Sequence, residues 1–436
     1  MLSTEAIVTW EKIVETVFMA LLATTFGTMI AVPISFFAAR NLMSEIKIPL
    51  SNIALSLIGW PLGIWVGIQG ANLAQALIRP MLENLALMFV LAIALPVVSF
   101  FAIRWSLLQR QREEDQEKRS RSRQIAYLLV MVVAAVLVIL SFLALGQILS
   151  DIGTRLTPTE DVPFYFMRRF MKQIGDLTVI LVPAVTALAS GGIIGGLFGN
   201  LGQIVSDRIT PAVGRTINLI ITPLAFALIA VVLMQGIDWF YQFNNPAITL
   251  WWPAGIGAFI GLALAVIFSP KQSLPIGIVM YGIIRTILNG TRSIEALVMA
   301  IVFVTWVGLG PFAGALALGL HTVAALSKLY SEQVESISEG PLEAVQATGA
   351  NRLQTIVFAV VPQIIPPYIS FTMYRWDINV RMSTLIGFVG GGGIGFILQQ
   401  NVNLLNYRAA SVNMLAIAIV VATMDYISSS LRERFV

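Results

Sequence analysis

Apolar runs long enough to cross a membrane recur along the whole chain, and they restrict its fold more than any other feature. A helix needs about 20 apolar residues to cross the hydrocarbon core of a bilayer, which is about 30 Å thick. Such runs between charged residues give about eleven candidate spans: roughly 17–39, 52–77, 84–104, 124–150, 177–204, 216–237, 249–269, 294–310, 312–330, 355–381 and 409–430. Only 11% of the 436 residues are charged, whereas about 25% is usual in soluble domains. The sequence therefore predicts an all-α fold, a polytopic transmembrane helical bundle.

The eighth and ninth candidate spans share one apolar run, "ALVMAIVFVTWVGLGPFAGALALGLHTVAALS". This run is too long for one upright helix. Its "GLGPFAG" segment combines glycine and proline, which favour turns. We therefore expect two short spans joined at this segment.

Cysteine and histidine, which often act in catalysis or metal binding, are scarce in this chain. The chain has no cysteine, which excludes disulfides, thiolate metal sites and cysteine nucleophiles. His321 is the single histidine, so histidine clusters for metal binding or proton relay are excluded, and a lone histidine in an apolar helix is more often a hydrogen-bonded core residue. We expect no metal site and no cofactor bound by this chain. The first residues carry three glutamates and lack the pattern of a cleaved signal peptide, so we expect them in the mature chain.

The most charged segment indicates the orientation. Residues Arg104–Arg123 hold seven basic and four acidic residues, and basic residues accumulate on the cytoplasmic side of a membrane. Counting spans from this linker places the loop 331–354 and the C-terminus in the cytoplasm and the N-terminus outside. The loop 151–174, with four basic and three acidic residues, weakly opposes this orientation. A solvated linker that fixes the topology is a better interpretation of 104–123 than a binding role.

The cytoplasmic loop leads into the segment "EAVQATGANRLQTIVFAVVP", which does not look like a membrane span. Pro341 suits the first position of a helix, where its missing amide donor costs nothing. Gly349 can take the left-handed conformation that ends a helix, and Asn351 can cap a second helix that runs into the next span. The pattern predicts a helix, a glycine turn and a second helix.

One face of the first of these helices is built from small residues. Ala344, Ala347 and Ala350 recur at intervals of three, and we expect Leu342 and Val345 to add apolar contact area. Such a face allows another protein to approach closely. An ordinary cytoplasmic helical hairpin is the alternative.

This loop resembles the coupling loop of ATP-binding-cassette importer permeases, whose pattern is Glu-Ala-Ala, three residues, Gly, nine residues, Ile, one residue, Leu-Pro. Glu343, Ala344, Gly349 and Pro362 fall at the matching positions. Valine replaces the second alanine, and positions 359 and 361 carry alanine and valine in place of isoleucine and leucine. The resemblance implies that Glu343, Ala344, Ala347, Gly349 and Pro362 couple the chain to an ATPase.

A wider resemblance links the chain to the phosphonate-type permease family. The stretches "ETVFMALLATTFGTMIAVPISFFAARN", "IIRTILNGTRSIEALVMA", "YRWDINVRMSTLIGFVGGGGIG" and "MDYISSSLRER" are similar to that family, and together the similar regions cover a little under half of the chain. The resemblance implies a type I ABC importer permease core, formed by an opening helix in 1–50 and by residues 271–436. Between them, 51–270 is interpreted as a six-span insertion, and an even number of spans leaves the orientation of the core unchanged.

The same resemblance implies the partners. Two copies would form a homodimer in the bacterial inner membrane, bind cytoplasmic ABC ATPase subunits and receive substrate from an extracytoplasmic substrate-binding protein. ATP would be bound and hydrolysed by the partner subunit, so the chain itself is not expected to be an enzyme. Membrane lipid is the expected surrounding, and no nucleic-acid partner is expected.

Four polar residues lie in the tenth candidate span, where we expect them at its outer end: Arg375, Asp377, Asn379 and Arg381. Charged residues in a membrane usually face a cavity or one another. Asp377 and Arg381 are four residues apart and predict an ion pair on one helix face. One interpretation places Arg375 or Arg381 against a phosphorus oxyanion in the translocation path, since a guanidinium group matches such oxygens. The other is a network between helices.

A glycine run, Gly390, Gly391, Gly392 and Gly393, follows this span. It lacks the Lys-Ser or Lys-Thr ending of a nucleotide-binding loop and follows a helix instead of a strand. We interpret it as the outer turn from which a half-length helix re-enters the bundle, with a role in gating.

The sequence thus predicts the transmembrane subunit of an ATP-driven importer of phosphonate or a related oxyanion such as phosphite or phosphate. The pattern does not select among these anions. An ion-coupled secondary transporter or channel without an ATPase is the alternative, and it would use intramembrane charges such as Asp377. Asp425, in the last span, is interpreted as a structural partner for a neighbouring helix.

Overall fold

The computed structural model describes residues 4–81, 84–115, 121–155 and 165–435. The chain forms two compact units, which we describe separately. Unit 1 contains Met1–Lys47, Asp161–Phe170 and Pro275–Val436, and unit 2 contains Ile48–Glu160 and Met171–Leu274. The assignment of these parts to a permease core and an insertion stays a prediction.

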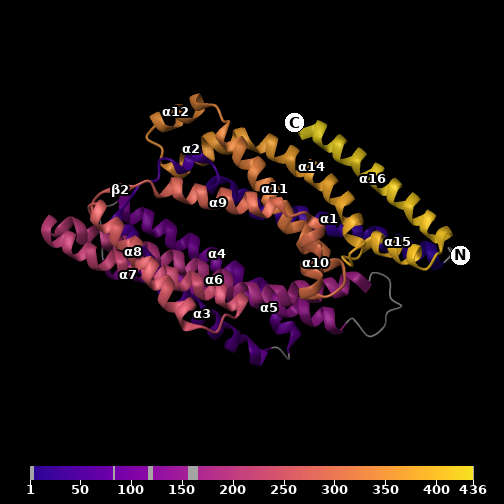
Figure 1. Cartoon of the computed structure of the whole chain (residues 1–436), viewed down its shortest axis with the longest axis horizontal. Helices are drawn as coiled ribbons and strands as arrows, with labels where there is room; N and C mark the ends of the chain where they lie inside the picture. Colours follow the sequence, from indigo (N-terminus) through magenta and orange to yellow (C-terminus); the bar gives the residue numbers. More distant parts are fainter. Residues whose placement is uncertain (1–3, 82–83, 116–120, 156–164, 436) are drawn as a thin grey trace. The chain divides into compact units, whose positions relative to one another are not determined.

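Unit 1 is built from helices only, as far as its described residues show. Its elements are α1 (Thr4–Phe37), α2 (Arg40–Met43), α9 (Ile276–Ser293), α10 (Ala296–Val307), α11 (Pro311–Glu335), α12 (Glu339–Ala347), α13 (Arg352–Thr355), the π-helical turn η3 (Ile356–Val360), α14 (Val361–Gly387), α15 (Gly393–Asn403) and α16 (Tyr407–Phe435). Figure 1 shows α12 beside α2 at one end of this unit, and α15 with the N-terminus at the other end. The short helix of the loop and the turn before α15 therefore lie at opposite ends.

The core of unit 1 lies where α1, α11 and α14 pack together (Figure 1). Leu326, Tyr330 and Val334 are spaced four residues apart, so they share one face of α11 and are fully buried. The rings of Tyr330 and Tyr368 stack with their centroids 3.8 Å apart. The Tyr368 hydroxyl lies 2.8 Å from the Ser35 hydroxyl, so the buried polar atoms have partners and α14 is tied to α1.

Unit 2 consists of long apolar helices and one short pair of strands. Its elements are β1 (Ile48–Pro49), α3 (Leu50–Ile78), the 3₁₀ turn η1 (Arg79–Met81), α4 (Leu85–Asp115), α5 (Arg121–Arg155), α6 (Tyr165–Arg208, whose first residues belong to unit 1), α7 (Pro211–Tyr241), the π-helical turn η2 (Ala247–Trp251), α8 (Trp252–Ile267) and β2 (Ser273–Leu274). The strands pair antiparallel, with Ile48 opposite Leu274.

Small residues allow α3 and α6 to approach closely within unit 2. A side chain at Gly63 would meet the backbone of Ser190 and Gly191. The Ser190 hydroxyl also donates a hydrogen bond of 2.7 Å to the Gly63 carbonyl oxygen. Small residues and interhelical hydrogen bonds of this kind replace the hydrophobic effect as the source of helix association in lipid.

Within the described residues, ten helices are long and apolar enough to cross a membrane, and six of them are α3 to α8. The predicted all-α transmembrane bundle is confirmed. The turn expected at "GLGPFAG" is also present, with positive φ angles at Gly308 and Gly310 directly before α11.

Two predicted spans need correction. Residues 294–310 do not form a spanning helix, because α10 has only 12 residues, or about 18 Å at 1.5 Å per residue. Helix α9, which lies between two of the predicted spans, passes the length and composition test only together with α10, and the two are bent by 88°. The tenth span continues to Gly387, so Arg381 lies inside it and not at its end.

Candidate functional site

The short helix α12 begins earlier than the sequence indicated. It starts at Glu339, after Ser338 in extended conformation, whereas we expected Pro341 at its first position. The four N-terminal amides of a helix have no acceptor within it, so proline fits the third position as well as the first. Gly349 follows the helix with φ of +80°, the left-handed conformation that the sequence predicted.

The second helix is capped by a reciprocal pair of hydrogen bonds. The Asn351 side-chain oxygen accepts a 2.9 Å bond from the Gln354 amide, and the Gln354 side-chain oxygen accepts a 2.8 Å bond from the Asn351 amide. This is a capping box, which satisfies two free amides at a helix start. It confirms the cap predicted at Asn351 and fixes the direction in which α13, η3 and α14 continue. Pro362 is the second residue of α14.

The two faces of α12 differ in exposure. Glu343, Ala344 and Ala347 are exposed, and no residue of the helix is buried. Leu342 is half-buried and packs against the core of unit 1. We expected Leu342 to add to a docking face; in the structure it packs partly against the core of unit 1 and is less exposed than the alanines. The exposed face therefore consists of the acidic residue and the alanines.

A cavity lies beside α12 on the side toward α2. Its volume is about 300 Å³, and it is lined by Asn41, Leu42, Glu45, Leu342, Gln346, Ala350, Thr355, Ile356 and Val360. Ala350 therefore borders a hollow within unit 1, while Ala344 and Ala347 are exposed to the outside.

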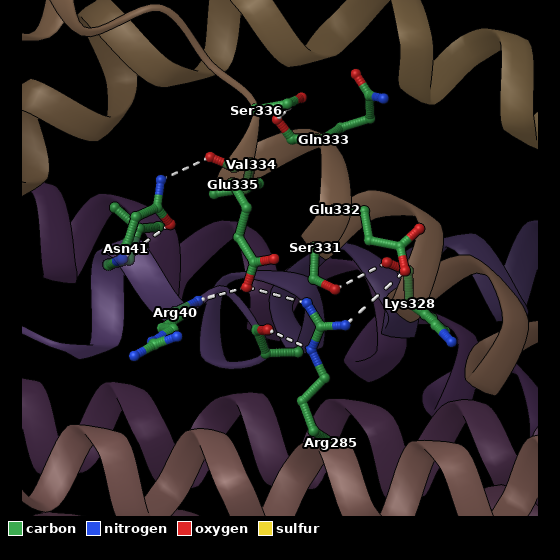
Figure 2. Close-up of polar contacts among 12 residues, drawn as sticks. Arg40, Asn41, Arg285, Lys328, Ser331, Glu332, Gln333, Val334, Glu335 and Ser336 are labelled. Atoms are coloured by element: carbon green, nitrogen blue, oxygen red, sulfur yellow. Dashed lines mark hydrogen bonds and ion pairs between the residues drawn. The ribbon is translucent and has the colours of Figure 1, made fainter.

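A polar network, which we call the α11 anchor, fixes the chain just before α12 (Figure 2). It consists of Arg285, Glu332, Glu335, Val334, Ala38, Arg40 and Asn41. Arg285 of α9 places Nη2 3.0 Å from the Glu335 carboxylate and Nη1 3.9 Å from the Glu332 carboxylate. Its Nε donates a 3.0 Å hydrogen bond to the carbonyl oxygen of Ala38. One arginine thus joins α9, the end of α11 and the residue after α1.

The other side of the α11 anchor comes from α2. The Arg40 amide donates a 2.7 Å hydrogen bond to the same Glu335 oxygen that Arg285 contacts. The Asn41 side-chain nitrogen donates a 2.7 Å bond to the carbonyl oxygen of Val334. Because α12 starts four residues after Glu335, a displacement of α12 acts close to helices α1, α9 and α11 together.

The polar residues of α14 divide into two faces. Arg375 and Asn379, four residues apart, contact α11. The Arg375 Nε donates to the Thr322 hydroxyl at 3.3 Å, and the Asn379 side-chain nitrogen donates to the hydroxyls of Thr322 at 2.9 Å and Thr24 at 2.8 Å. Asn379 thereby connects α14 to α11 and α1 inside the helix bundle.

The second polar face of α14 is directed toward α16. Arg381 pairs with Asp377, as the spacing predicted, and its Nη2 also lies 3.5 Å from the Asp425 carboxylate of α16. Asp425 is thus a partner of a neighbouring helix, as expected. For Arg381 and Asp377 the structure matches the interpretation as a network between helices.

The glycine run forms a compact turn between α14 and α15. Positive φ angles of 90°, 78° and 75° occur at Gly390, Gly392 and Gly393, which only glycine adopts without strain. Gly314 of α11 lies against this turn, because a side chain at Gly314 would meet the Gly391 carbonyl oxygen. The turn leads into α15, which has 11 residues and is too short to cross a bilayer.

Two residues of α1 hold this turn in place, and the sequence analysis did not identify them. Glu15 is fully buried, and one of its carboxylate oxygens accepts a 2.8 Å hydrogen bond from the Gly393 amide. The Thr16 hydroxyl accepts a 2.8 Å bond from the Ile394 amide. Lys12 pairs with the other Glu15 oxygen at 2.6 Å. The sequence pattern that could have pointed to these residues is a Lys and a Glu three positions apart, directly before a long apolar run.

Within the described residues, no group of three or more histidine, cysteine, aspartate or glutamate side chains could hold a metal ion. The contacts described above are hydrogen bonds and ion pairs between helices, and contacts of this kind suit binding and conformational change.

Comparison with known proteins also indicates a membrane transport protein. Residues 257–436 match the family model described as binding-protein-dependent transport system inner membrane component. The chain is 39% identical to the phosphite transport system permease protein PtxC of Stutzerimonas stutzeri, over 40% of this chain and 66% of that protein. It is 34% identical to the phosphate-import permease protein PhnE of Mycolicibacterium smegmatis, over 42% of this chain and 34% of that protein.

The chain spans less than two thirds of the length of each of these two relatives. A third relative is the Escherichia coli protein PhnE2, whose name refers to a cryptic phosphonate transport system. The identity is 43% over 121 residues, which are 28% of this chain and 99% of that protein. From this match over a relative's whole length and the family match, the chain belongs to the family of binding-protein-dependent transport system inner membrane components.

Proposed function

We propose that this multi-pass inner membrane protein is the transmembrane subunit of an ATP-driven importer of a phosphorus oxyanion, such as phosphonate, phosphite or phosphate. The names of three relatives support the substrate class, because they refer to phosphite, phosphate and phosphonate transport. The chain forms the translocation path and hydrolyses no ATP itself. The ATP is bound by a separate cytoplasmic ATPase subunit.

The observation that carries the proposal is the exposed face of α12. Glu343, Ala344 and Ala347 project from a short helix that ends at left-handed Gly349. Small side chains allow close approach, and Glu343, in the middle of α12, adds a negative charge to this face. Pro362 is the second residue of the long helix α14 beyond the turn. We infer that this face seats in the ATPase subunit.

The α11 anchor and the capping box then give a route for movement. When the ATPase subunits close, they displace α12. The ion pair of Arg285 and Glu335 carries the displacement toward α1, α9 and α11, and the Asn351 cap carries it into α14. Because rigid elements move together, a small shift at one site can change the access to another site.

The remaining partners follow from this arrangement. In this proposal the α12 end of unit 1 faces the cytoplasm and the α15 end faces outward, with the N-terminus outside and the C-terminus in the cytoplasm. Figure 1 shows these two opposite ends of unit 1. Two copies of the chain form a homodimer with two ATPase subunits. An extracytoplasmic substrate-binding protein delivers the anion near the turn of Gly390 to Gly393, which acts in gating.

Reconstitution tests this function. The chain is purified with its ATPase subunit, placed in liposomes, and supplied with the binding protein and radiolabelled methylphosphonate or phosphite. We expect uptake that requires ATP. The variant Glu343→Lys should abolish uptake while the protein still inserts, because it reverses the charge on the docking face.

The matched control is Asp207→Lys, which reverses an exposed charge near the end of α6 and should keep uptake. Uptake driven by an ion gradient without ATP, with no ATPase subunit accompanying the solubilised protein, would instead support the secondary transporter. Normal uptake by Glu343→Lys would contradict docking through this face.

A further inference from the structure

One buried arginine of α14 makes no ion pair with any residue that the structure describes. Arg375 is 8% exposed and lies in a helix long enough to cross the membrane. Arg285 contacts the Glu335 carboxylate and Arg381 contacts that of Asp377, but in the described part of the chain Arg375 makes no ion pair. Burying a cation at membrane depth is costly, and such charges usually mark a substrate or ion pathway.

The contacts of Arg375 are all to neutral groups. Its Nε donates to the Thr322 hydroxyl at 3.3 Å, and its Nη2 donates to Nδ1 of His321. An arginine has five N–H donors, so these bonds leave three for another acceptor. Because arginine only donates, His321 accepts at Nδ1 and carries its hydrogen on Nε2, which makes the imidazole a second donor beside the guanidinium.

The surrounding residues hold this pair of donors in position. Thr322, directly after His321, bonds to both Arg375 and Asn379, and Asn379 also bonds to Thr24. Thr322 and Asn379 are fully buried, so α1, α11 and α14 are fixed relative to one another where the guanidinium lies. The donors are therefore preorganised, which lowers the cost of binding.

We propose that Arg375, oriented by Thr322 and joined by His321, is a subsite on the translocation path that binds a tetrahedral phosphorus oxyanion. The inference rests on the proposed import function and names the residues that receive the anion. A guanidinium donates two parallel hydrogen bonds to such an anion. The bound substrate supplies the counter-charge that no ion pair among the described residues gives Arg375.

The test uses the reconstituted complex of the full chain, its ATPase subunit and the binding protein. Uptake of radiolabelled methylphosphonate and ATP hydrolysis are measured together for the wild type, Arg375→Gln and Arg375→Lys. The matched control is Arg408→Gln, which removes an exposed arginine of α16. The amount of assembled complex is determined for each variant.

We expect Arg375→Gln to lower uptake by about tenfold or more, the size expected from losing hydrogen bonds to a charged group. ATP hydrolysis stimulated by the substrate-loaded binding protein persists, since docking is intact. Arg375→Lys retains part of the uptake because it keeps the charge, and Arg408→Gln matches the wild type. A merely structural arginine would instead change uptake and hydrolysis together.

Uptake by Arg375→Gln at the wild-type level overturns the subsite. So does a parallel loss of uptake and ATP hydrolysis in both Arg375 variants. Absence of ATP-driven uptake in the wild-type complex is a different result, and it overturns the proposed function together with the subsite.

A phospholipid headgroup carries the same oxyanion chemistry as the substrate. Changing the lipid composition of the vesicles distinguishes the two ligands. The measurement is repeated in phosphatidylcholine vesicles with and without phosphatidylglycerol. We expect the uptake defect of Arg375→Gln in both. A defect that appears only with the anionic lipid assigns the guanidinium to a headgroup and overturns the substrate subsite.

Discussion

Gly349 separates α12 from the helix that enters the membrane bundle, and its φ of +80° gives the first prediction. A non-glycine residue in the left-handed region costs about 1–2 kcal/mol, and β-branched residues are the least suited to it. We expect Gly349→Val to abolish ATP-dependent uptake while leaving membrane insertion intact, because the angle between α12 and α13 changes. Uptake and the amount of inserted protein are measured in the same vesicles.

Asparagine is the matched control at this position, since it tolerates the left-handed conformation better than other non-glycine residues. Gly349→Asn should therefore retain most of the uptake. Equal activity of the valine and asparagine variants would show that the backbone conformation at this turn does not matter for coupling.

Local residue patterns made some of these features predictable. The left-handed Gly349, the Asn351 cap and the Asp377–Arg381 pair depend on neighbours within four residues, so the sequence contains the information. Glu15 could not be assigned to the glycine turn, because the amide that it accepts from is 378 residues away. The contact of Arg375 with His321 likewise joins two helices and has no local signature.

At the scale of elements, hydropathy predicted most of the long helices, but not that α9 is a helix of this kind or that α10 is too short to be a span. Hydropathy reports only the length of an apolar run, and the span 294–310 was predicted on that basis alone. In the structure Ile294 and Glu295 adopt extended conformations, which separates the two helices. Glu295 directly precedes α10 as its N-terminal flanking residue, a position that the composition of the run alone did not reveal.

The α11 anchor predicts a measurable coupling between two side chains. The side chains of Arg285 and Glu335 are 17% and 29% exposed, and Arg285 Nη2 lies 3.0 Å from the Glu335 carboxylate. A double-mutant cycle with Arg285→Gln and Glu335→Gln should give an interaction of about 0.5–3 kcal/mol in the free energy of unfolding, as for residues in contact. Thermal or denaturant unfolding of the solubilised protein measures it, and each single variant should also lower uptake per ATP hydrolysed.

The control cycle pairs Arg285→Gln with Glu339→Gln, an exposed glutamate at the start of α12. These two changes should add within about 0.5 kcal/mol, as expected for independent sites. Equal interaction terms in both cycles would contradict a specific role for the anchor.

At the scale of the whole molecule, the two segments of unit 1 that flank residues 48–274 lie next to each other. The Gly277 amide donates a 3.1 Å hydrogen bond to the Ile46 carbonyl oxygen. A short glycine-serine linker from Lys47 to Pro275 can therefore replace residues 48–274, which comprise unit 2 and the unit 1 segment Asp161–Phe170. Because unit 2 supplies six of the candidate spans, its removal leaves the orientation of unit 1 unchanged.

We expect this shortened chain to insert and to retain ATP-dependent uptake, since α12, the α11 anchor and α14 all belong to unit 1. Uptake in liposomes and protease mapping of the loop 331–354 measure the two outcomes. Complete loss of ATP-dependent uptake in a well-inserted protein would show that unit 2 takes part in transport.

The central claim is that the exposed face of α12 seats in an ATPase subunit, and crosslinking tests it most directly. The chain has no cysteine, so Ala344→Cys introduces a single thiol that a short thiol-to-amine crosslinker can join to a neighbouring lysine. Leu404→Cys is the control, since residue 404 is 70% exposed and directly follows α15 at the other end of unit 1 (Figure 1). The account predicts a covalent product with the ATPase subunit from the thiol at position 344 and none from position 404. No product at 344, with the complex intact, would contradict it.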